Sequence, residues 1–205
     1  MSGAFPSTVG FETLDWQSNT TSRVTTSVSG KTQRLKVSGQ YWSFKLKSPY
    51  MSRASVMADY SFLVQQDGQA SAFTIVPPEV SSTRGTATGT ITVLDDSTFT
   101  SASMAAGSKN VPVANAGNTG TLKKGDLIKF SNHNKVYMLT EDVNLDGSTI
   151  NTLGIYPGLT TALTGTETVT YNSVPITVYL EKDEVSYATQ ANGLYRYEIT
   201  LKEEI

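Results

Sequence analysis

The sequence contains no cysteine and a single histidine, His133. Without thiols the chain can form neither disulfides nor Cys-ligated zinc sites, and cysteine-based catalysis is excluded. One histidine cannot build a His-rich metal site, and any Ser-His-Asp triad would have to include His133. No run of residues approaches the roughly 18 consecutive apolar residues that a membrane-spanning helix requires. Residues 1–6 have neither the basic nor the apolar region of a secretory signal, so none is expected.

Charge of either sign is also scarce. Charged residues make up 17% of the 205 residues, and the formal net charge is −2. A protein whose main task is to grip phosphate backbones normally carries a basic surface, which this composition lacks. By elimination, these absences favour an architectural or binding protein over an enzyme.

Strand-forming and turn-forming residues are abundant, which predicts a mainly β fold. The clearest strands alternate apolar and polar side chains, as a sheet with one buried face requires. Asn192-Gly193 precedes the last of them and suits a tight hairpin turn, because both residues tolerate positive φ. The clear strands are 41–47, 174–180 and 194–202, and weaker ones are expected at 12–17, 23–29, 33–37 and 72–76.

One segment of the first half has helical periodicity. Ser48-Pro49 reads as an N-cap followed by proline at the first helical position, and Asp67-Gly68 provides a stop. Between them, apolar residues recur at offsets of three and four, which predicts one long helix that covers the sheet. The apolar stripe consists of Met51, Ala54, Ala58 and Phe62.

A change of composition divides the chain. Residues 81–89 are small, polar and turn-prone, as at a domain boundary, and short strands with frequent glycine follow as far as Tyr171. This spacing predicts a small β-barrel over residues 85–172, inserted into a β-rich domain made of residues 1–84 and 173–205. The barrel strands are expected at 90–94, 110–114, 126–131, 135–141, 149–156 and 168–171.

A calcium-loop pattern has two interpretations. Asp142-x-Asn144-x-Asp146-Gly147 imitates the start of an EF-hand loop, but the twelfth position is Leu153 instead of a bidentate glutamate. The flanking residues also have strand character, so a hairpin turn closed by Asp-Gly explains the same pattern and is favoured over calcium.

Two further motifs contain residues that could form a site. His133 lies between two expected strands, where a solvated turn residue is the more common interpretation than a catalytic base. Lys123-Lys124-Gly125-Asp126, with Phe130 and Tyr137 nearby, suits a barrel that binds single-stranded nucleic acid or an oligosaccharide. With a net charge near zero, a turn before a strand with core aromatics is the favoured interpretation.

Adjacent carboxylates do not form an acid/base pair. In strands, neighbours such as Asp183-Glu184 and Glu203-Glu204 diverge to opposite faces, and both pairs are interpreted as solvated strand ends. The sequence therefore predicts no catalytic, cofactor-binding or metal-binding residue and no cofactor, and it does not identify an oligomer interface.

Three groups of segments, in this order along the chain, resemble the distal tail proteins of long-tailed bacteriophages, in particular T-five-type siphophages. The first group matches their N-terminal domain, the second a module of phage structural proteins and the third the end of the same family. The first group comprises Phe5-Pro6, Gly10-Phe11, Thr32-Gln33-Arg34, 38–44, Ser48-Pro49-Tyr50-Met51, Asp67-Gly68 and 73–77; the second 120–130, 135–137 and 155–159; the third 178–180, Asp183, Tyr187 and 193–197.

The resemblance implies a β-sandwich with one helix, made from both chain ends, with an inserted small barrel like an oligonucleotide/oligosaccharide-binding (OB) fold that projects outward. It implies a hexameric ring in the virion that joins the tail tube to the tail tip or baseplate, with hub and fibre proteins as further partners. DNA would only pass through the lumen. Some relatives use such an insertion to contact carbohydrate, and the family has no catalytic residues.

Three hypotheses follow. The primary one is a non-enzymatic ring adaptor at the distal end of the tail, made in the host cytoplasm. The alternative is a glycan-binding module whose inserted barrel contacts a host-surface saccharide. A hydrolase that works through His133 is the least favoured.

Overall fold

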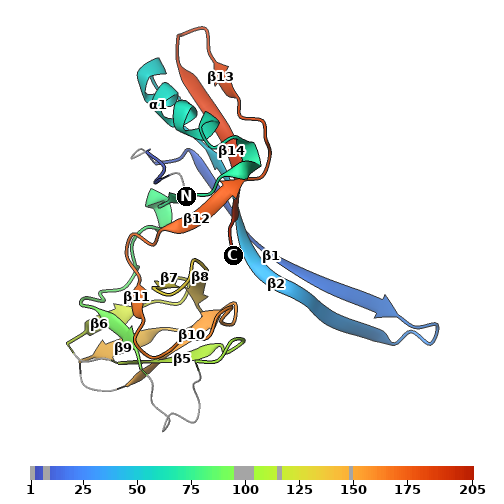
Figure 1. Ribbon diagram of the computed structural model, residues 1–205, viewed down its shortest axis with the longest axis vertical. Helices are drawn as coiled ribbons and strands as arrows, with labels where there is room; N and C mark the ends of the chain where they lie inside the picture. The colour runs from blue at the N-terminus through green and yellow to red at the C-terminus, as the bar shows by residue number, and fades with distance from the viewer. Residues whose placement is uncertain (1–2, 7–9, 95–103, 115–116, 148–149) are drawn as a thin grey trace.

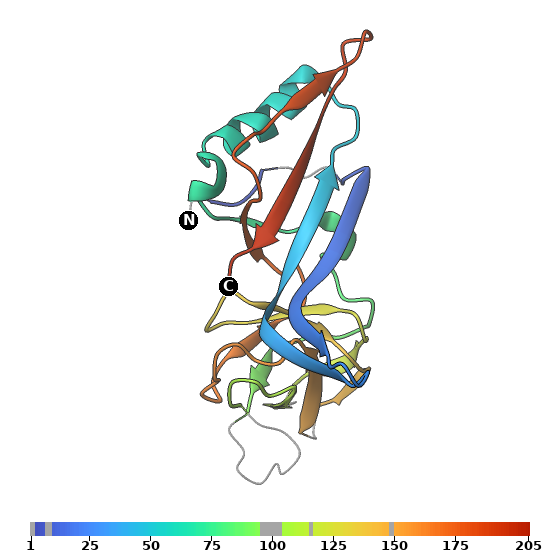
Figure 2. The same cartoon turned by 90° about the vertical axis from the view of Figure 1, so that its right-hand side faces the viewer.

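The computed structural model describes residues 3–6, 10–94, 104–114, 117–147 and 150–205. The chain is mainly β, with one α-helix, a large antiparallel sheet and a closed barrel in a sandwich-like arrangement, so the predicted fold class is confirmed. Figures 1 and 2 show the barrel at one end of the molecule and the helix at the other. Both chain termini lie near the sheet, between these two ends (Figure 1).

The large sheet has the order β1-β2-β14-β12-β3, and β13 also pairs with β14. Its buried side chains follow the predicted alternation: Phe44 and Leu46 on β2, and Ile199 and Leu201 on β14, face one core. The hairpin at Asn192-Gly193 is also present, with Gly193 at a φ of 77°. The strands are β1 (Thr13–Thr26), β2 (Thr32–Lys47), β3 (Phe73–Ile75), β12 (Ile176–Leu180), β13 (Tyr187–Thr189) and β14 (Tyr195–Glu203).

The helix α1 (Arg53–Val64) begins later than predicted, with Ser52 as its N-cap. Ser48 instead pairs with the sheet: its N–H donates to Tyr197 O at 3.0 Å, and its Oγ accepts the Tyr197 N–H at 3.0 Å. Met51 continues this pairing with Tyr195. The helix start is therefore delayed because these residues form hydrogen bonds with β14, a partner distant in sequence.

The buried face of α1 also differs from the predicted stripe. Val56, Asp59 and Leu63 are buried, whereas Ala54 and Ala58 are exposed. The buried face contains a carboxylate because Asp59 Oδ2 accepts a hydrogen bond from the Tyr197 hydroxyl at 2.9 Å. Two short 3-10 helices follow α1: η1 (Gly68–Ala70) and η2 (Pro78–Val80).

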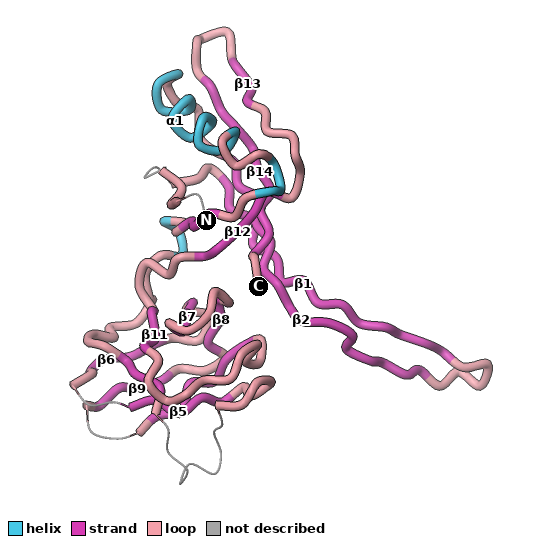
Figure 3. The backbone as a smooth tube through the Cα atoms, in the orientation of Figure 1, coloured by secondary structure: helices cyan, strands magenta, loops and turns pink. Residues whose placement is uncertain are grey.

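Strands β1 and β2 are longer than the sequence pattern predicted. The segments expected as separate strands join into one antiparallel hairpin that pairs from Thr13–Lys47 to Thr26–Thr32, with one register break between Thr20 and Ser22. Strand β14 pairs with β2 only along residues 43–47. The remaining hairpin, residues 18–40, projects from the body in Figures 1 and 3 and is called the arm below.

The barrel is closed in the order β10-β5-β4-β11-β7-β8, and all six predicted strands are present, although Thr149 at the start of one expected strand lies outside the described residues. Two strands were not predicted: β6 and β9, which form their own two-stranded sheet. The barrel strands are β4 (Ile91–Val93), β5 (Asn110–Ala114), β7 (Leu127–Phe130), β8 (Val136–Leu139), β10 (Asn151–Tyr156) and β11 (Thr168–Thr170); the additional pair is β6 (Thr119–Leu122) and β9 (Val143–Asp146).

The two segments that connect the sheet with the barrel lie side by side. Ser173 N–H donates to Ser81 O, and Thr83 N–H donates to Asn172 Oδ1 at 3.0 Å. The chain therefore leaves the sheet and returns to it at neighbouring points. The barrel residues interrupt the sheet in sequence but do not separate its strands in space. None of the described helices is long and apolar enough to cross a membrane.

Candidate functional site

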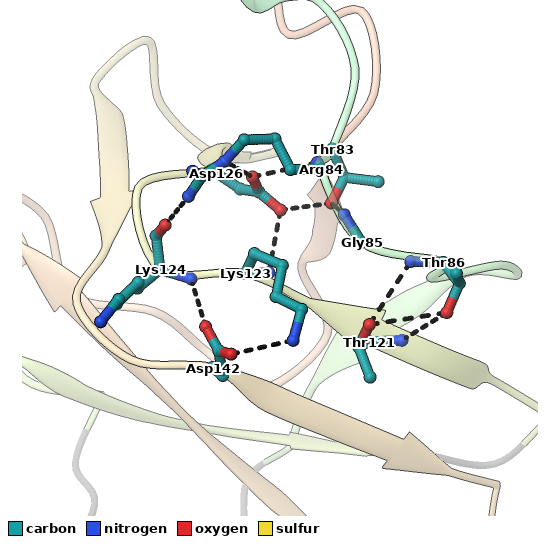
Figure 4. A network of polar contacts seen from close by, with 9 residues as sticks. All are labelled: Thr83, Arg84, Gly85, Thr86, Thr121, Lys123, Lys124, Asp126 and Asp142. Atoms are coloured by element: carbon teal, nitrogen blue, oxygen red, sulfur yellow. Dashed lines mark hydrogen bonds and ion pairs between the residues drawn. The ribbon is translucent and has the colours of Figure 1, made fainter.

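The Lys123-Lys124-Gly125-Asp126 turn holds the segment through which the chain enters the barrel (Figure 4). The buried carboxylate of Asp126 accepts hydrogen bonds from the Thr83 hydroxyl, from Arg84 N–H at 3.1 Å and from Lys123 N–H at 2.9 Å. Arg84 also donates to Lys124 O, and its Nε lies 3.3 Å from Asp126 Oδ1. The motif is a turn before β7, as its structural interpretation predicted, and it also ties the first connecting segment to the barrel.

Asp142, the first residue of the calcium-loop pattern, belongs to the same network (Figure 4). Its carboxylate accepts Lys124 N–H and binds Lys123 Nζ, both at 2.9 Å. The backbone hydrogen bond from Lys124, reinforced by Lys123, lowers the pKa of Asp142. The following residues form β9, and the described part of the chain contains no group of three His, Cys, Asp or Glu side chains that could hold a metal ion.

His133 lies at the end of the barrel against Tyr137. His133 Nε2 and the Tyr137 hydroxyl are 2.7 Å apart, and Nδ1 contacts Asn132 Oδ1. Burial, with a smaller contribution from Lys129, lowers the pKa of His133. Among the described residues no carboxylate forms a hydrogen bond with the imidazole, so the contacts do not assemble a Ser-His-Asp arrangement.

The joint between sheet and barrel is a buried polar cluster that the sequence analysis did not identify. Lys135, directly before β8, forms an ion pair with Glu203 at the end of β14, and their side chains are 1% and 0% exposed. Glu203 also accepts Trp42 N–H at 3.0 Å and Val136 N–H at 2.8 Å. The Trp42 indole donates to Val136 O at 2.9 Å. The interpretation of Glu203 as a solvated strand end was wrong.

Burial has opposite effects on the two charged groups of this joint. It raises the pKa of Glu203 and lowers the pKa of Lys135, while their attraction opposes both shifts. The alternation along β14 contained the missed signal, because Glu203 continues the inward series of Tyr197, Ile199 and Leu201. The partner on the barrel could not be found from that pattern, since 68 positions separate Lys135 from Glu203.

The joint is also apolar. Leu127 and Val136 belong to barrel strands, yet they are buried in the core of the large sheet. Met138 and Tyr156 of the barrel pack against the same core. The barrel therefore packs directly against the core of the sheet at this contact.

A cleft of about 470 Å³ lies between the base of the arm and the rim of the barrel. The arm contributes Lys36 and Gln40, and the barrel contributes Lys109 and Thr160. Gln40 is 1% exposed, and its Oε1 has no hydrogen-bond partner among the described residues. The cleft thus combines ammonium groups with an amide and a hydroxyl, which are groups suited to a polar ligand.

The comparisons with known proteins agree with this architecture. Residues 92–174 match the family described as "Distal tail protein pb9, B domain", which covers most of the barrel. The chain is 26% identical over 188 residues to "Distal tail protein pb9" of Escherichia phage T5, a match that covers 91% of this chain and 88% of that protein. These matches support a structural role in a phage tail and favour a non-enzymatic protein. The chain is thus related along most of its length to the T5-like distal tail proteins, and its barrel to their B domain.

Proposed function

We propose that the chain is a ring-forming adaptor at the distal end of a phage tail, where six copies join the tail tube to the tail tip. The observation that carries this proposal is the similarity to a distal tail protein over 91% of the chain, which includes both the sheet and the barrel. In the virion the partners are further copies of the chain, the tube protein, and the hub and fibre proteins of the tip or baseplate. No enzymatic activity is part of this role.

The edges of the large sheet support a ring. At one edge, β3 is covered by the N-terminal segment: Phe5 N–H donates to Thr74 O at 2.8 Å, and Thr74 N–H donates to Gly3 O at 3.0 Å. At the other edge, β1 pairs with β2 alone. An uncovered strand edge readily pairs with another chain. The two unlike edges suit a closed ring, in which each copy presents two different surfaces.

The composition suits a channel for DNA. A lumen through which DNA passes must not hold the phosphate backbone tightly, and the net charge of the chain is −2. DNA is therefore proposed as a passing cargo and not as a bound ligand.

Gold labelling of intact phage particles with an antibody against the purified chain tests the location. We expect label where the tail tube meets the tip. Reproducible absence from particles, with the antigen found free in the lysate, would contradict the adaptor role. Electron microscopy of the purified protein, searched for six-fold rings, tests the copy number separately.

The second candidate function is binding of a host-surface saccharide through the barrel, and the cleft between arm and barrel favours it. Titration of the full chain with cell-envelope glycans, followed by NMR, measures this activity. We expect saturable shifts at Lys109 and Thr160 if the cleft is a glycan site. Absence of any shift at millimolar glycan would leave only the adaptor role.

We further propose that residues 85–172 form a domain inserted into a domain made of residues 1–84 and 173–205. The paired connecting segments near Ser81 and Ser173 support this division. Limited proteolysis of the full chain should cut first near Arg84 or Asn172 and release a fragment that stays folded. Early cuts scattered inside either unit would argue for one continuous domain.

A further inference from the structure

The arm is a two-stranded ribbon without further support from the sheet. Between residues 32 and 42, β2 does not pair with β14. Strand β1 pairs with β2 alone. An isolated two-stranded hairpin is at best marginally stable in water. This arm would therefore gain stability from a surface that covers it, and its side chains indicate which kind of surface that is.

The outer part of the arm combines exposed aliphatic side chains with positive charge. Val28 in the turn is fully exposed, and Leu35 is 65% exposed. No acidic residue occurs between Asp15 and Asp59, although the whole chain has a net charge of −2. Among the described residues, none of the arm's cations forms an ion pair. The exposed aliphatic residues are Val24, Val28, Leu35 and Val37, and the cations are Arg23, Lys31, Arg34 and Lys36.

A hollow of about 280 Å³ at the C-terminal end of α1 has the complementary character. Leu63, Val64 and Val185 give it apolar walls, and Asp67 and Asp183 place two carboxylates beside them. Val64 is 51% exposed, one of the few large apolar side chains outside the arm to be so exposed.

Contacts with the backbone fix the position of the Asp183 carboxylate. Asp183 Oδ1 accepts the Gln69 N–H at 3.0 Å. Gly68, at a φ of 65°, lies so close to Asp183 that a Cβ atom would come within 2.8 Å of the Asp183 Cα. The hollow is therefore built by close packing of two segments far apart in sequence.

We propose that the tip of the arm docks into this hollow on a second copy of the chain. Aliphatic residues of the arm would cover Val64 and Val185, and its cations would face Asp67 and Asp183. Within one chain the two surfaces do not meet, because the arm runs away from α1 in both Figure 1 and Figure 2. The contact joins unlike surfaces, so it is heterologous and repeats from copy to copy. The inference rests on the proposed ring and names one of its contacts.

Disulfide trapping in the full chain tests the contact, because the natural sequence has no cysteine. Val28→Cys chains are mixed with Val64→Cys chains under mild oxidation, and disulfide-linked dimers are quantified. We expect the mixed dimer to exceed either homodimer at least five-fold. A matched control mixes Val28→Cys with Ile205→Cys, which also replaces an exposed aliphatic residue but lies outside the hollow.

Charge reversal separates docking from random collision. Adding Arg34→Glu to the Val28→Cys chain should reduce the mixed dimer several-fold, as should raising the salt concentration. Arg53→Glu, which reverses an exposed charge at the opposite end of α1 from the hollow, should leave the yield unchanged. Equal yields for Val64→Cys and Ile205→Cys, or insensitivity to Arg34→Glu, would overturn the proposal and point to another occupant of the arm.

Light scattering of the wild-type chain at the same concentration distinguishes this proposal from that of the ring. Larger assemblies without the mixed disulfide would overturn the docking contact and leave the ring intact. Mixed dimers without a closed assembly would support the contact and argue against a ring of six. If neither the mixed disulfide nor a larger assembly forms, the result contradicts both the docking contact and the ring.

Discussion

Glu203 illustrates how one charged side chain connects two parts of the molecule. Its carboxylate accepts hydrogen bonds from β2 and β8 and also binds Lys135. Removing one partner from a buried ion pair leaves an uncompensated charge, which costs more than the pair itself contributes. The joint is therefore sensitive to loss of either charge.

We expect Glu203→Gln to lower the free energy of unfolding by about 3–5 kcal/mol, because Lys135 keeps its charge in a buried position. Chemical denaturation measures this change. Glu181→Gln is the matched control, since Glu181 pairs with Lys202 at the surface and exposed pairs contribute little. Similar losses for both variants would show that burial of the Lys135 pair is not the cause.

The carboxylate of Glu167 should make the stability of the fold depend on pH. Burial alone would favour the protonated form, but hydrogen bonds from Thr164 N–H and Oγ1, both at 2.8 Å, and from the Gly165 N–H outweigh it. They hold the pKa of Glu167 below its ordinary value of 4.5. A carboxylate with a lowered folded-state pKa stabilises the fold above its unfolded pKa, and that stability is lost as the pH falls through the folded pKa.

The corresponding variant is Glu167→Gln. Its melting temperature should lie below that of the wild type at pH 7, and the difference should shrink as the pH falls below 4.5. Thermal melts between pH 7 and pH 3 measure both quantities. A difference that stays constant over this range would show that the charge of Glu167 is not responsible.

At the element scale, α1 shows how pairing with the sheet overrides a capping signal. Ser48-Pro49 has the local pattern of a helix start, but Ser48 and Met51 form hydrogen bonds with β14. Ser52 Oγ then accepts the Ser55 N–H at 3.4 Å and caps the helix.

We therefore expect Ser52→Ala to cost about 1 kcal/mol and to speed amide exchange in the first turn of α1. Hydrogen exchange at residues 53–56 measures this fraying. Ser48→Ala should leave exchange in that turn unchanged, although it removes a hydrogen bond to the Tyr197 N–H. Faster exchange in Ser48→Ala alone would indicate that the predicted cap is the effective one.

At the scale of the whole molecule, the joint couples the sheet to the barrel. Leu127 and Val136 would become exposed if the barrel separated from the sheet, and the Trp42 indole would lose its bond to Val136 O. Loss of buried apolar area and of buried hydrogen bonds both oppose separation.

The intact chain should therefore unfold in one cooperative transition, with equal calorimetric and van't Hoff enthalpies. Tryptophan fluorescence and far-UV circular dichroism should report the same midpoint. Two resolved transitions would mean that the sheet and the barrel are energetically independent. In that case the polar joint would serve orientation and not stability.

Much of this fold follows from local patterns. Alternation identified β2, β12 and β14 because a two-residue period depends only on neighbouring residues. The six barrel strands were predicted from their short, regular spacing and frequent glycine. Strands β6 and β9 were missed since Gly120 and the Asp142–Gly147 pattern resemble turns, and only their pairing with each other makes them strands.

The sequence by itself determined the mainly β class, the positions of the barrel strands and the exclusion of thiol chemistry, because composition and short-range patterns suffice for these. The tertiary structure decided the later start of α1, the length of the arm and the burial of Glu203 beside Lys135. Each of these depends on a partner distant along the chain. Local propensity cannot encode such a contact, since its free energy arises only when the two segments meet.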